Sequence, residues 1–190
     1  GKSGVFSSAL DLSSLDGSNG FRNDGATASD RSGIAVSGGG DVNGDGFDDL
    51  IIGAQFATGG AVASGQSYVV FGKSGGFAAA LKLSSLNGSN GFRIDGIDFI
   101  DYSGFAVSGG GDVNGDGFDD LVIGAKYVDA GANYSGQSYV VFGGNFTGGA
   151  ETQVGTDAAN TLTAIQGATA RDILIGGRGN DTLISDGGPD

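Results

Sequence analysis

The chain has 190 residues, of which 41 are glycine, one is proline and none is cysteine or histidine. The missing residue types exclude disulfides, thiolate metal sites and nucleophiles paired with histidine. The formal net charge of −13 disfavours nucleic acid and anionic membrane surfaces as partners and favours cations, although a solvated acidic surface would carry the same charge. Frequent glycine favours turns over helices, so we expect an all-β fold, and no apolar run is long enough for membrane insertion.

A repeat with a period of 71 residues organises most of the chain, as the shift from Asp41 to Asp112 shows. Three segments recur at this spacing: 12–22 as 83–93, 40–50 as 111–121, and 64–72 as 135–143. The two units span about residues 3–73 and 74–144, and residues 1–6 read as the close of a preceding unit.

Short runs rich in Val, Ile, Tyr and Phe alternate with Gly, Asn, Asp and Ser clusters, which is typical of strands and turns. We expect about four strands per unit, at 33–37, 50–54, 66–71 and 91–95, with second-copy equivalents near 104–108, 121–125 and 137–142. Tandem four-stranded sheets that cover one another are propeller blades, and a closed propeller has about 4 to 8 of them. The expected fold is therefore a partial β-propeller, with further blades as partners and apolar sheet faces left exposed.

The most informative segment of each unit is an Asp/Asn-rich loop between two expected strands. Oxygen-bearing side chains occupy loop positions 1, 3, 5 and 9, and Ca²⁺ prefers about 6 to 8 such oxygen ligands. A backbone carbonyl at position 7 would add one ligand, and glycine at position 6, Gly46 or Gly117, would allow a sharp turn with positive φ. The candidate calcium ligands are Asp41, Asn43, Asp45, Phe47 and Asp49 in the first loop, and Asp112, Asn114, Asp116, Phe118 and Asp120 in the second.

These loops differ from the helix-flanked calcium loop, which needs a Glu at position 12, because Ile52 and Ile123 stand there. Their flanks read as strands, so we interpret them as β-hairpin calcium loops closed by the position-9 Asp. We expect Asp48 and Asp119 to face outward. The alternative is that Asn, Asp and Gly are simply good turn formers.

Each unit resembles the FG-GAP repeat, the blade of integrin-α-type β-propellers. The matching elements are Phe71-Gly72 and Phe142-Gly143 for "FG", Gly53-Ala54 and Gly124-Ala125 for "GA", and the acidic loops between them. The resemblance implies that these loops bind calcium. Gln55 and Lys126 depart from the pattern, since the name leads one to expect proline there.

The tail has a different composition, so we place a domain boundary near residue 150, between a repeat domain at 1–149 and a second region at 150–190. Residues 176–184 fit a nine-residue Gly- and Asp-rich repeat, and residues 167–175 fit it partly. This resembles the start of an RTX (hemolysin-type) array, which implies a parallel β-roll, type I secretion and calcium ligands at Asp172, Gly177, Gly179 and Asp181. A flexible Gly-rich tail is the alternative.

The function that these features favour is a calcium-binding extracellular module, secreted or at the cell surface, with a structural and adhesive role. Calcium would pin the hairpins, and a protein or glycan would be the ligand. No catalytic or organic-cofactor residues are predicted, so we do not expect an enzyme. The alternative is a non-catalytic accessory region of a secreted hydrolase. Clustered carboxylates could in principle act on a glycan, but carboxylates that bind calcium would not be free to do so.

Overall fold

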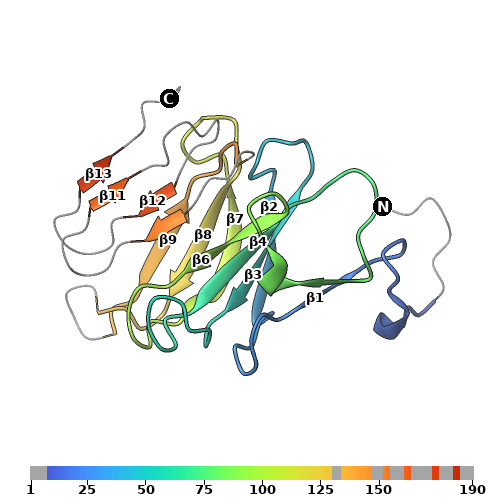
Figure 1. Cartoon of the computed structure of the whole chain (residues 1–190), viewed down its shortest axis with the longest axis horizontal. Helices are drawn as coiled ribbons and strands as arrows, with labels where there is room; N and C mark the ends of the chain where they lie inside the picture. The colour runs from blue at the N-terminus through green and yellow to red at the C-terminus, as the bar shows by residue number, and fades with distance from the viewer. Residues whose placement is uncertain are drawn as a thin grey trace.

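The computed structural model describes residues 8–129 and 134–146, together with the backbone of four short strands between residues 152 and 184. An antiparallel sheet of four strands forms the first layer, in the order β2-β3-β4-β6 (Figure 1). Its strands are β2 (Ala35–Gly40), β3 (Asp49–Ala54), β4 (Gln66–Val70) and β6 (Gly91–Asp95). The four strands expected for a blade are thus confirmed, and the fourth comes from the second sequence unit.

A second antiparallel sheet repeats the first three strands in the order β7-β8-β9. They are β7 (Ser103–Gly111), β8 (Asp120–Ala125) and β9 (Gln137–Val141). The pairing registers correspond across the 71-residue shift, because Ile51 lies opposite Val69 and Val122 lies opposite Val140. Within the described residues the second sheet has three strands, so it is an incomplete copy of the first.

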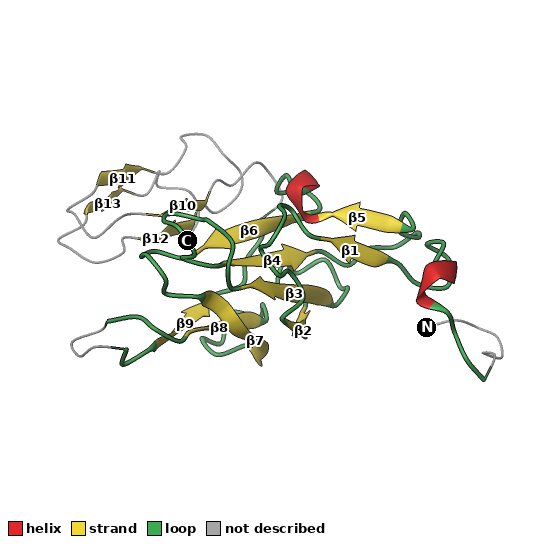
Figure 2. Ribbon diagram, turned by 90° about the horizontal axis from the view of Figure 1, so that it is seen from below, coloured by secondary structure: helices red, strands yellow, loops and turns green. Residues whose placement is uncertain are grey.

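The two sheets stack face to face (Figure 2). Because side chains alternate along a strand, each sheet has two faces, which we name the Phe face and the Tyr face. The Phe face consists of Ile51, Val69 and Phe71 in the first sheet and Val122, Val140 and Phe142 in the second. The Tyr face consists of Leu50, Ile52, Tyr68 and Val70 in the first sheet and Leu121, Ile123, Tyr139 and Val141 in the second.

The main hydrophobic core joins the Phe face of the first sheet to the Tyr face of the second. It also contains Val42, Ile94 and Phe146. Close approach of the two backbones explains the glycine of the "GA" element, since a Cβ at Gly53 would collide with the Gly104 carbonyl oxygen. The Tyr face of the first sheet is partly covered by a smaller cluster that includes Leu81, Leu83 and Leu86.

A small two-stranded parallel ribbon lies beside the first sheet (Figure 2). It pairs β1 (Arg22–Asp24) with β5 (Ala80–Lys82), and two 3₁₀ turns, η1 (Leu12–Ser14) and η2 (Leu83–Ser85), flank it. In the repeat, β1 is the counterpart of β6. Both strands carry an Arg–Asp ion pair of 2.8 Å, Arg22 with Asp24 and Arg93 with Asp95.

Four short strands are described in the tail. The pairs are both parallel: β10 (Thr152–Val154) with β12 (Ile173–Ile175), and β11 (Thr161–Thr163) with β13 (Thr182–Ile184). The predicted ligands Asp172, Gly177, Gly179 and Asp181 lie outside the described residues. The parallel β-roll and its RTX resemblance therefore stay predictions. In the described part of the chain, no helix has the length and apolarity needed to cross a membrane.

Candidate calcium loops

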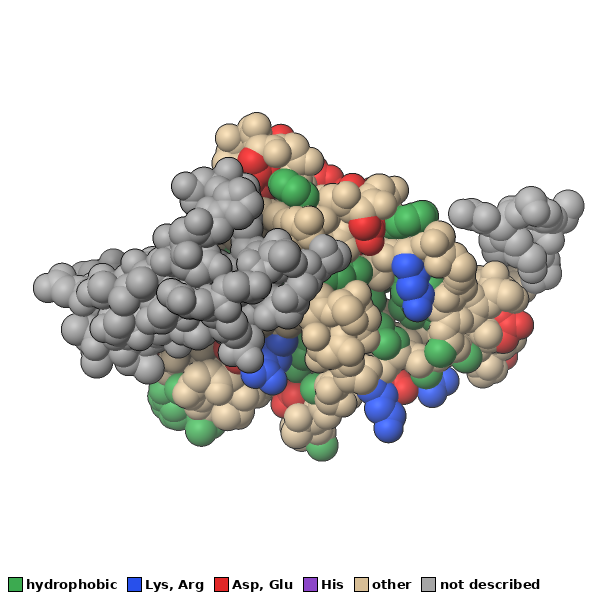
Figure 3. Space-filling model, turned by 45° about the horizontal axis from the view of Figure 1, so that its top comes forward, with side chains coloured by type: hydrophobic (Ala, Val, Ile, Leu, Met, Phe, Trp, Pro, Cys, Tyr) green, Lys and Arg blue, Asp and Glu red, His purple; other side chains and the backbone are tan. Residues whose placement is uncertain are grey.

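The two acidic loops lie at the same end of the stacked sheets, one between β2 and β3 and the other between β7 and β8 (Figure 1). Acidic side chains gather along the upper edge of the described surface in Figure 3, whereas Lys and Arg side chains lie lower. The loops touch each other, because the Asp119 N–H donates to the Asp41 carbonyl oxygen at 3.2 Å. Both candidate sites therefore occupy one acidic edge.

In the first loop, the side chains at positions 1, 3 and 5 converge on the loop's own backbone. The Asp45 N–H donates to Asp41 Oδ1 and to Asn43 Oδ1, both at 3.0 Å. The Gly46 N–H donates to Asp41 Oδ2 at 2.9 Å, and the Phe47 N–H donates to Asp45 Oδ1 at 2.9 Å. Gly46 has φ of 87°, which is the positive φ expected at position 6. The loop thus brings three oxygen-bearing side chains together.

The second loop repeats each of these bonds and adds one, from the Gly115 N–H to Asp112 Oδ1 at 2.7 Å. The Asp116 N–H donates to Asp112 Oδ1 and Asn114 Oδ1 at 3.0 Å, and the Gly117 N–H donates to Asp112 Oδ2 at 2.9 Å. Gly117 also has positive φ, at 92°. An ordinary turn needs one such side-chain contact. The same set of contacts in both copies indicates a conformation that the loop sequence itself specifies.

The position-9 aspartates are placed differently from the other three. Asp49 and Asp120 are fully buried at the start of β3 and β8. Asp49 accepts from the Val42 N–H at 3.0 Å and from the Gly72 N–H at 2.8 Å. Asp120 accepts from the equivalent amides of Val113 and Gly143 at 2.8 and 2.9 Å. Each of these carboxylates therefore ties the acidic loop to the "FG" element after the third strand.

The same contact explains the glycine of the "FG" element. A Cβ at Gly72 would come within 2.5 Å of the Asp48 carbonyl oxygen and 2.7 Å of Phe47 Cβ. Burial raises the pKa of Asp49 to about 6, although the two amide hydrogen bonds act in the opposite direction. A carboxylate held in this way is ready for a nearby cation, because a positive charge would favour its ionised form.

The candidate donors are all oxygens, which suits calcium. Their positions suit calcium less well, because not every donor is placed with the others. Among the described residues, no three carboxylates are clustered closely enough to form a ready-made metal site. Asp41, Asn43 and Asp45 are together, whereas both oxygens of Asp49 already accept amide hydrogen bonds. An ionised carboxylate has about four lone-pair sites, so each Asp49 oxygen retains acceptor capacity beyond its amide bond.

One expectation about these loops was wrong. Asp48 is exposed, as expected, but Asp119 is half-buried and does not face outward. Its Oδ2 accepts from the Asp41 N–H at 2.8 Å, which joins the second loop to the first. The loop sequence could not reveal this contact, because it depends on how the two sheets stack.

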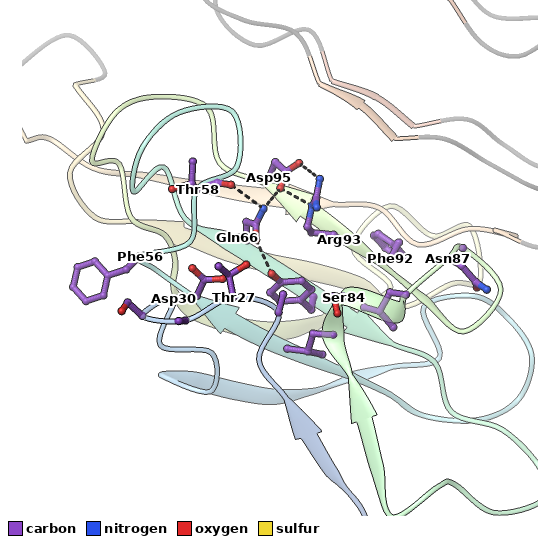
Figure 4. A pocket seen from close by; sticks show the side chains of 17 residues that line it. Thr27, Asp30, Phe56, Thr58, Gln66, Ser84, Asn87, Phe92, Arg93 and Asp95 are labelled. Carbon is purple, nitrogen blue, oxygen red and sulfur yellow. Dashed lines mark hydrogen bonds and ion pairs between the residues drawn. The ribbon is translucent and has the colours of Figure 1, made fainter.

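A hollow of about 930 Å³ on the Tyr face of the first sheet was also missed (Figure 4). Gln66 lies at its centre, donates through Nε2 to Asp95 Oδ1 at 2.7 Å, and accepts from the Tyr68 hydroxyl at 2.6 Å. Burial raises the pKa of Tyr68 to about 12. Asp30 is 7% exposed, and its carboxylate accepts no hydrogen bond from the described residues. No sequence motif marks this hollow, because its walls come from separate segments of the repeat.

Comparison with known proteins agrees with this geometry. Residues 32–70 and 103–141 match the FG-GAP repeat. Two segments of the chain, one in each sheet, thus match this repeat. The first match begins three residues before β2 and the second begins with β7; each ends with the third strand of its sheet, so it includes the acidic loop. Repeats of this kind are typically non-catalytic.

Integrin α chains are distant homologues. Integrin alpha pat-2 of Caenorhabditis elegans is 37% identical over 95 residues, which is 50% of this chain and 7% of that protein. Integrin alpha-E of Mus musculus is 34% identical over 103 residues, covering 50% and 8%. Integrin alpha-PS2 of Drosophila melanogaster is 36% identical over 106 residues, covering 56% and 7%. The chain thus spans less than a tenth of the length of each of these relatives.

Proposed function

We propose that this integrin-α-like FG-GAP module binds calcium in both acidic loops and serves a structural and adhesive role outside the cell. The observation that carries the proposal is the identical convergence of the side chains at positions 1, 3 and 5 in the two loops. Three oxygen-bearing groups held this close, in a chain of net charge −13, favour a bound cation.

The proposed ligands are those expected from the sequence. The first ion would be held by the side chains of Asp41, Asn43 and Asp45 and by the carbonyl of Phe47. Asp49 would add a further oxygen while keeping its hydrogen bonds to the two amides. The second site would use Asp112, Asn114, Asp116, Phe118 and Asp120 in the same roles. Bound calcium would neutralise the clustered carboxylates. The chain's own contribution is to fix the hairpin in register, because Asp49 and Asp120 tie each loop to its third strand.

The acidic edge would then be a rigid surface for an extracellular protein or glycan ligand. The likeness to integrin α chains supports the proposed extracellular or cell-surface placement. We also propose the domain boundary near residue 150 and an RTX-like role for residues 150–190, with type I secretion. Calcium is scarce inside cells, so a ligand that binds only the folded state would then favour folding after export.

Calorimetric titration with calcium tests the proposal. Asp45→Asn and Asp116→Asn each remove one charge but retain a side-chain oxygen that can accept the hydrogen bond from the amide two residues further along the chain. We expect two sites in the unaltered chain, one site in each variant, and none in the double variant. Asp48→Asn is the matched control, because Asp48 is exposed and belongs to the same loop. A folded chain without heat of binding at millimolar calcium would contradict the proposal.

A further inference from the structure

The two outer faces of the stacked sheets are wholly or partly uncovered, and they correspond to the pair of faces already joined inside the stack. On the Phe face, Val69 and Phe71 of the first sheet are 0% and 5% exposed, whereas their counterparts Val140 and Phe142 in the second sheet are 48% and 52% exposed. The Tyr face shows the reverse on its β2 side only, since Leu121 is 0% exposed and Leu50 is 37% exposed. Its other residues, Ile52, Tyr68 and Val70, are already buried against Leu81, Leu83 and Leu86 of the same chain. One end of the molecule thus presents a free Phe face, and the other presents a Tyr face that is open along β2.

The two sheets also differ because the second lacks the counterpart of β6 among the described residues. In the first sheet, β6 pairs with β4, and Ile94 lies opposite Ser67. The corresponding edge of β9 pairs with no strand in the described part of the chain. The repeat counterpart of β6 is β1, whose described partner is β5 alone. By the register of β4 with β6, residues 20–24 fit beside β9 with Asn23 opposite Ser138.

The backbone at both free ends already has the conformation of the internal junction. There, the Ile100, Tyr102 and Ser103 amides donate to the Val62, Ala63 and Ser64 carbonyl oxygens at 3.2, 3.4 and 2.9 Å. Ile100 and Tyr102 have φ of 65° and 54°, and Ser29 and Arg31 at the free end have φ of 72° and 54°.

The opposing loop is repeated as well, because Ala63 has φ of 52° and Tyr134 has φ of 56°. Positive φ is costly for residues other than glycine, so these positions indicate two preformed halves of one interface.

Two buried polar atoms without partners lie at the open part of the Tyr face. Asn23 Oδ1 and Ser32 Oγ are buried and have no hydrogen-bond partner among the described residues. Both side chains line a cavity of about 340 Å³, together with Val36 and Leu50, which are 67% and 37% exposed. The larger hollow around Gln66 opens on this face too (Figure 4). Ser67 Oγ, at the internal junction, is also buried without a partner among the described residues, so the exposed apolar side chains are the stronger sign that a covering layer is absent.

We propose that a second copy of this chain supplies that layer. Residues 20–24 of one copy add to the free edge of β9 in another, completing a four-stranded sheet. The free Phe face of the second copy then covers the open part of the Tyr face of the first, at Val36 and Leu50. The two surfaces differ, so the contact is head to tail and can continue into larger rings or filaments.

The absence of cysteine permits a clean test by disulfide trapping. One copy carries Asn23→Cys, the other carries Ser138→Cys, and the two have different masses. Mixed and oxidised, they should give a linked heterodimer, because the two side chains lie opposite each other on one face of the completed sheet. The matched control replaces Asn23→Cys by Arg22→Cys, whose side chain points to the opposite face. We expect the matched pair to be linked several-fold more than the control pair.

Association without any cross-link should also depend on concentration. Light scattering after gel filtration should show mass above that of one chain, and Val140→Lys should return the mass to that of a monomer with unchanged circular dichroism. Equal linkage in the matched and control pairs would overturn the proposal. So would a monomer at every concentration, which would leave the free faces for other blades.

Discussion

The two acidic loops share one sequence, yet they differ in what covers them. Val42 in the first loop is 0% exposed and lies in the main core, whereas its counterpart Val113 is 58% exposed. Asn43 is buried and Asn114 is exposed. The first loop packs against the second sheet, and no described residue packs in the same way on the second loop. The two loops therefore have the same local conformation but different packing, because only the first has a neighbouring sheet against it among the described residues.

The largest expected effect comes from placing a charge at the covered position. Val42→Asp would bury an unpaired carboxylate in the main core and should cost several kcal/mol of unfolding free energy. Val113→Asp adds the same charge at an exposed position and should change stability by about 0.5 kcal/mol or less. Denaturant unfolding of both variants measures the contrast. Equal losses would show that the stacking of the sheets does not distinguish the loops.

A glycine pair distinguishes the two sheets next. Gly53→Ala should cost about 1 to 3 kcal/mol, because its Cβ would collide with the Gly104 carbonyl oxygen across the interface. At the equivalent Gly124, the nearest atom to an added Cβ is Ala106 Cβ at 3.6 Å, an ordinary contact. Gly124→Ala should therefore be nearly neutral. Thermal unfolding tests both variants. A large loss of stability in Gly124→Ala would indicate that another layer packs against the second sheet.

The pH dependence of the calcium-free chain reports on the buried clamp. The pKa of Asp49 is about 6 in the folded chain, against an ordinary value of 3.8. A raised pKa means that the folded state binds the proton more tightly than the unfolded state. The stabilisation from this proton is therefore complete below pH 3.8 and is lost as the pH rises through about 6. Asp49→Asn should flatten the stability profile in this range.

Asp48→Asn is the control for that profile, because it removes a charge from the neighbouring exposed side chain. Denaturant unfolding in chelator, measured from about pH 4.5 to pH 7.5, gives the slope for each variant. The Asp48 variant should keep the slope of the unaltered chain. An unchanged slope in the Asp49 variant would assign the titration to another group.

The smallest effect concerns the bond between the loops. Asp119→Ala removes the acceptor of the Asp41 N–H and should cost about 1 kcal/mol, the usual value of one hydrogen bond. Asp48→Ala, at the equivalent position of the first loop, should cost less than about 0.5 kcal/mol. Chemical unfolding at constant calcium resolves the difference. Similar small losses would show that the contact between the loops contributes no net stability.

Much of the fold could be predicted from the sequence because its signals are local. Short runs rich in Val, Ile, Tyr and Phe between Gly- and Asp-rich turns located the strands of both sheets, because the first residue types favour strands and the second favour turns. The positive φ of Gly46 and Gly117 followed from the turn that each loop must make. The convergence of Asp41, Asn43 and Asp45 was likewise local, because these residues lie within five positions of one another.

What the sequence alone determined is thus the content of each repeat: its strands, its turns and the oxygen-rich loop. The stacking of sheets decided the rest. It made Val42 core and Val113 surface, turned Asp119 inward, buried Asp49 beneath its loop, and built a sheet across the boundary between two sequence units. The physical reason is that burial depends on the neighbouring layer, and two identical repeats cannot have identical neighbours at the two ends of a stack.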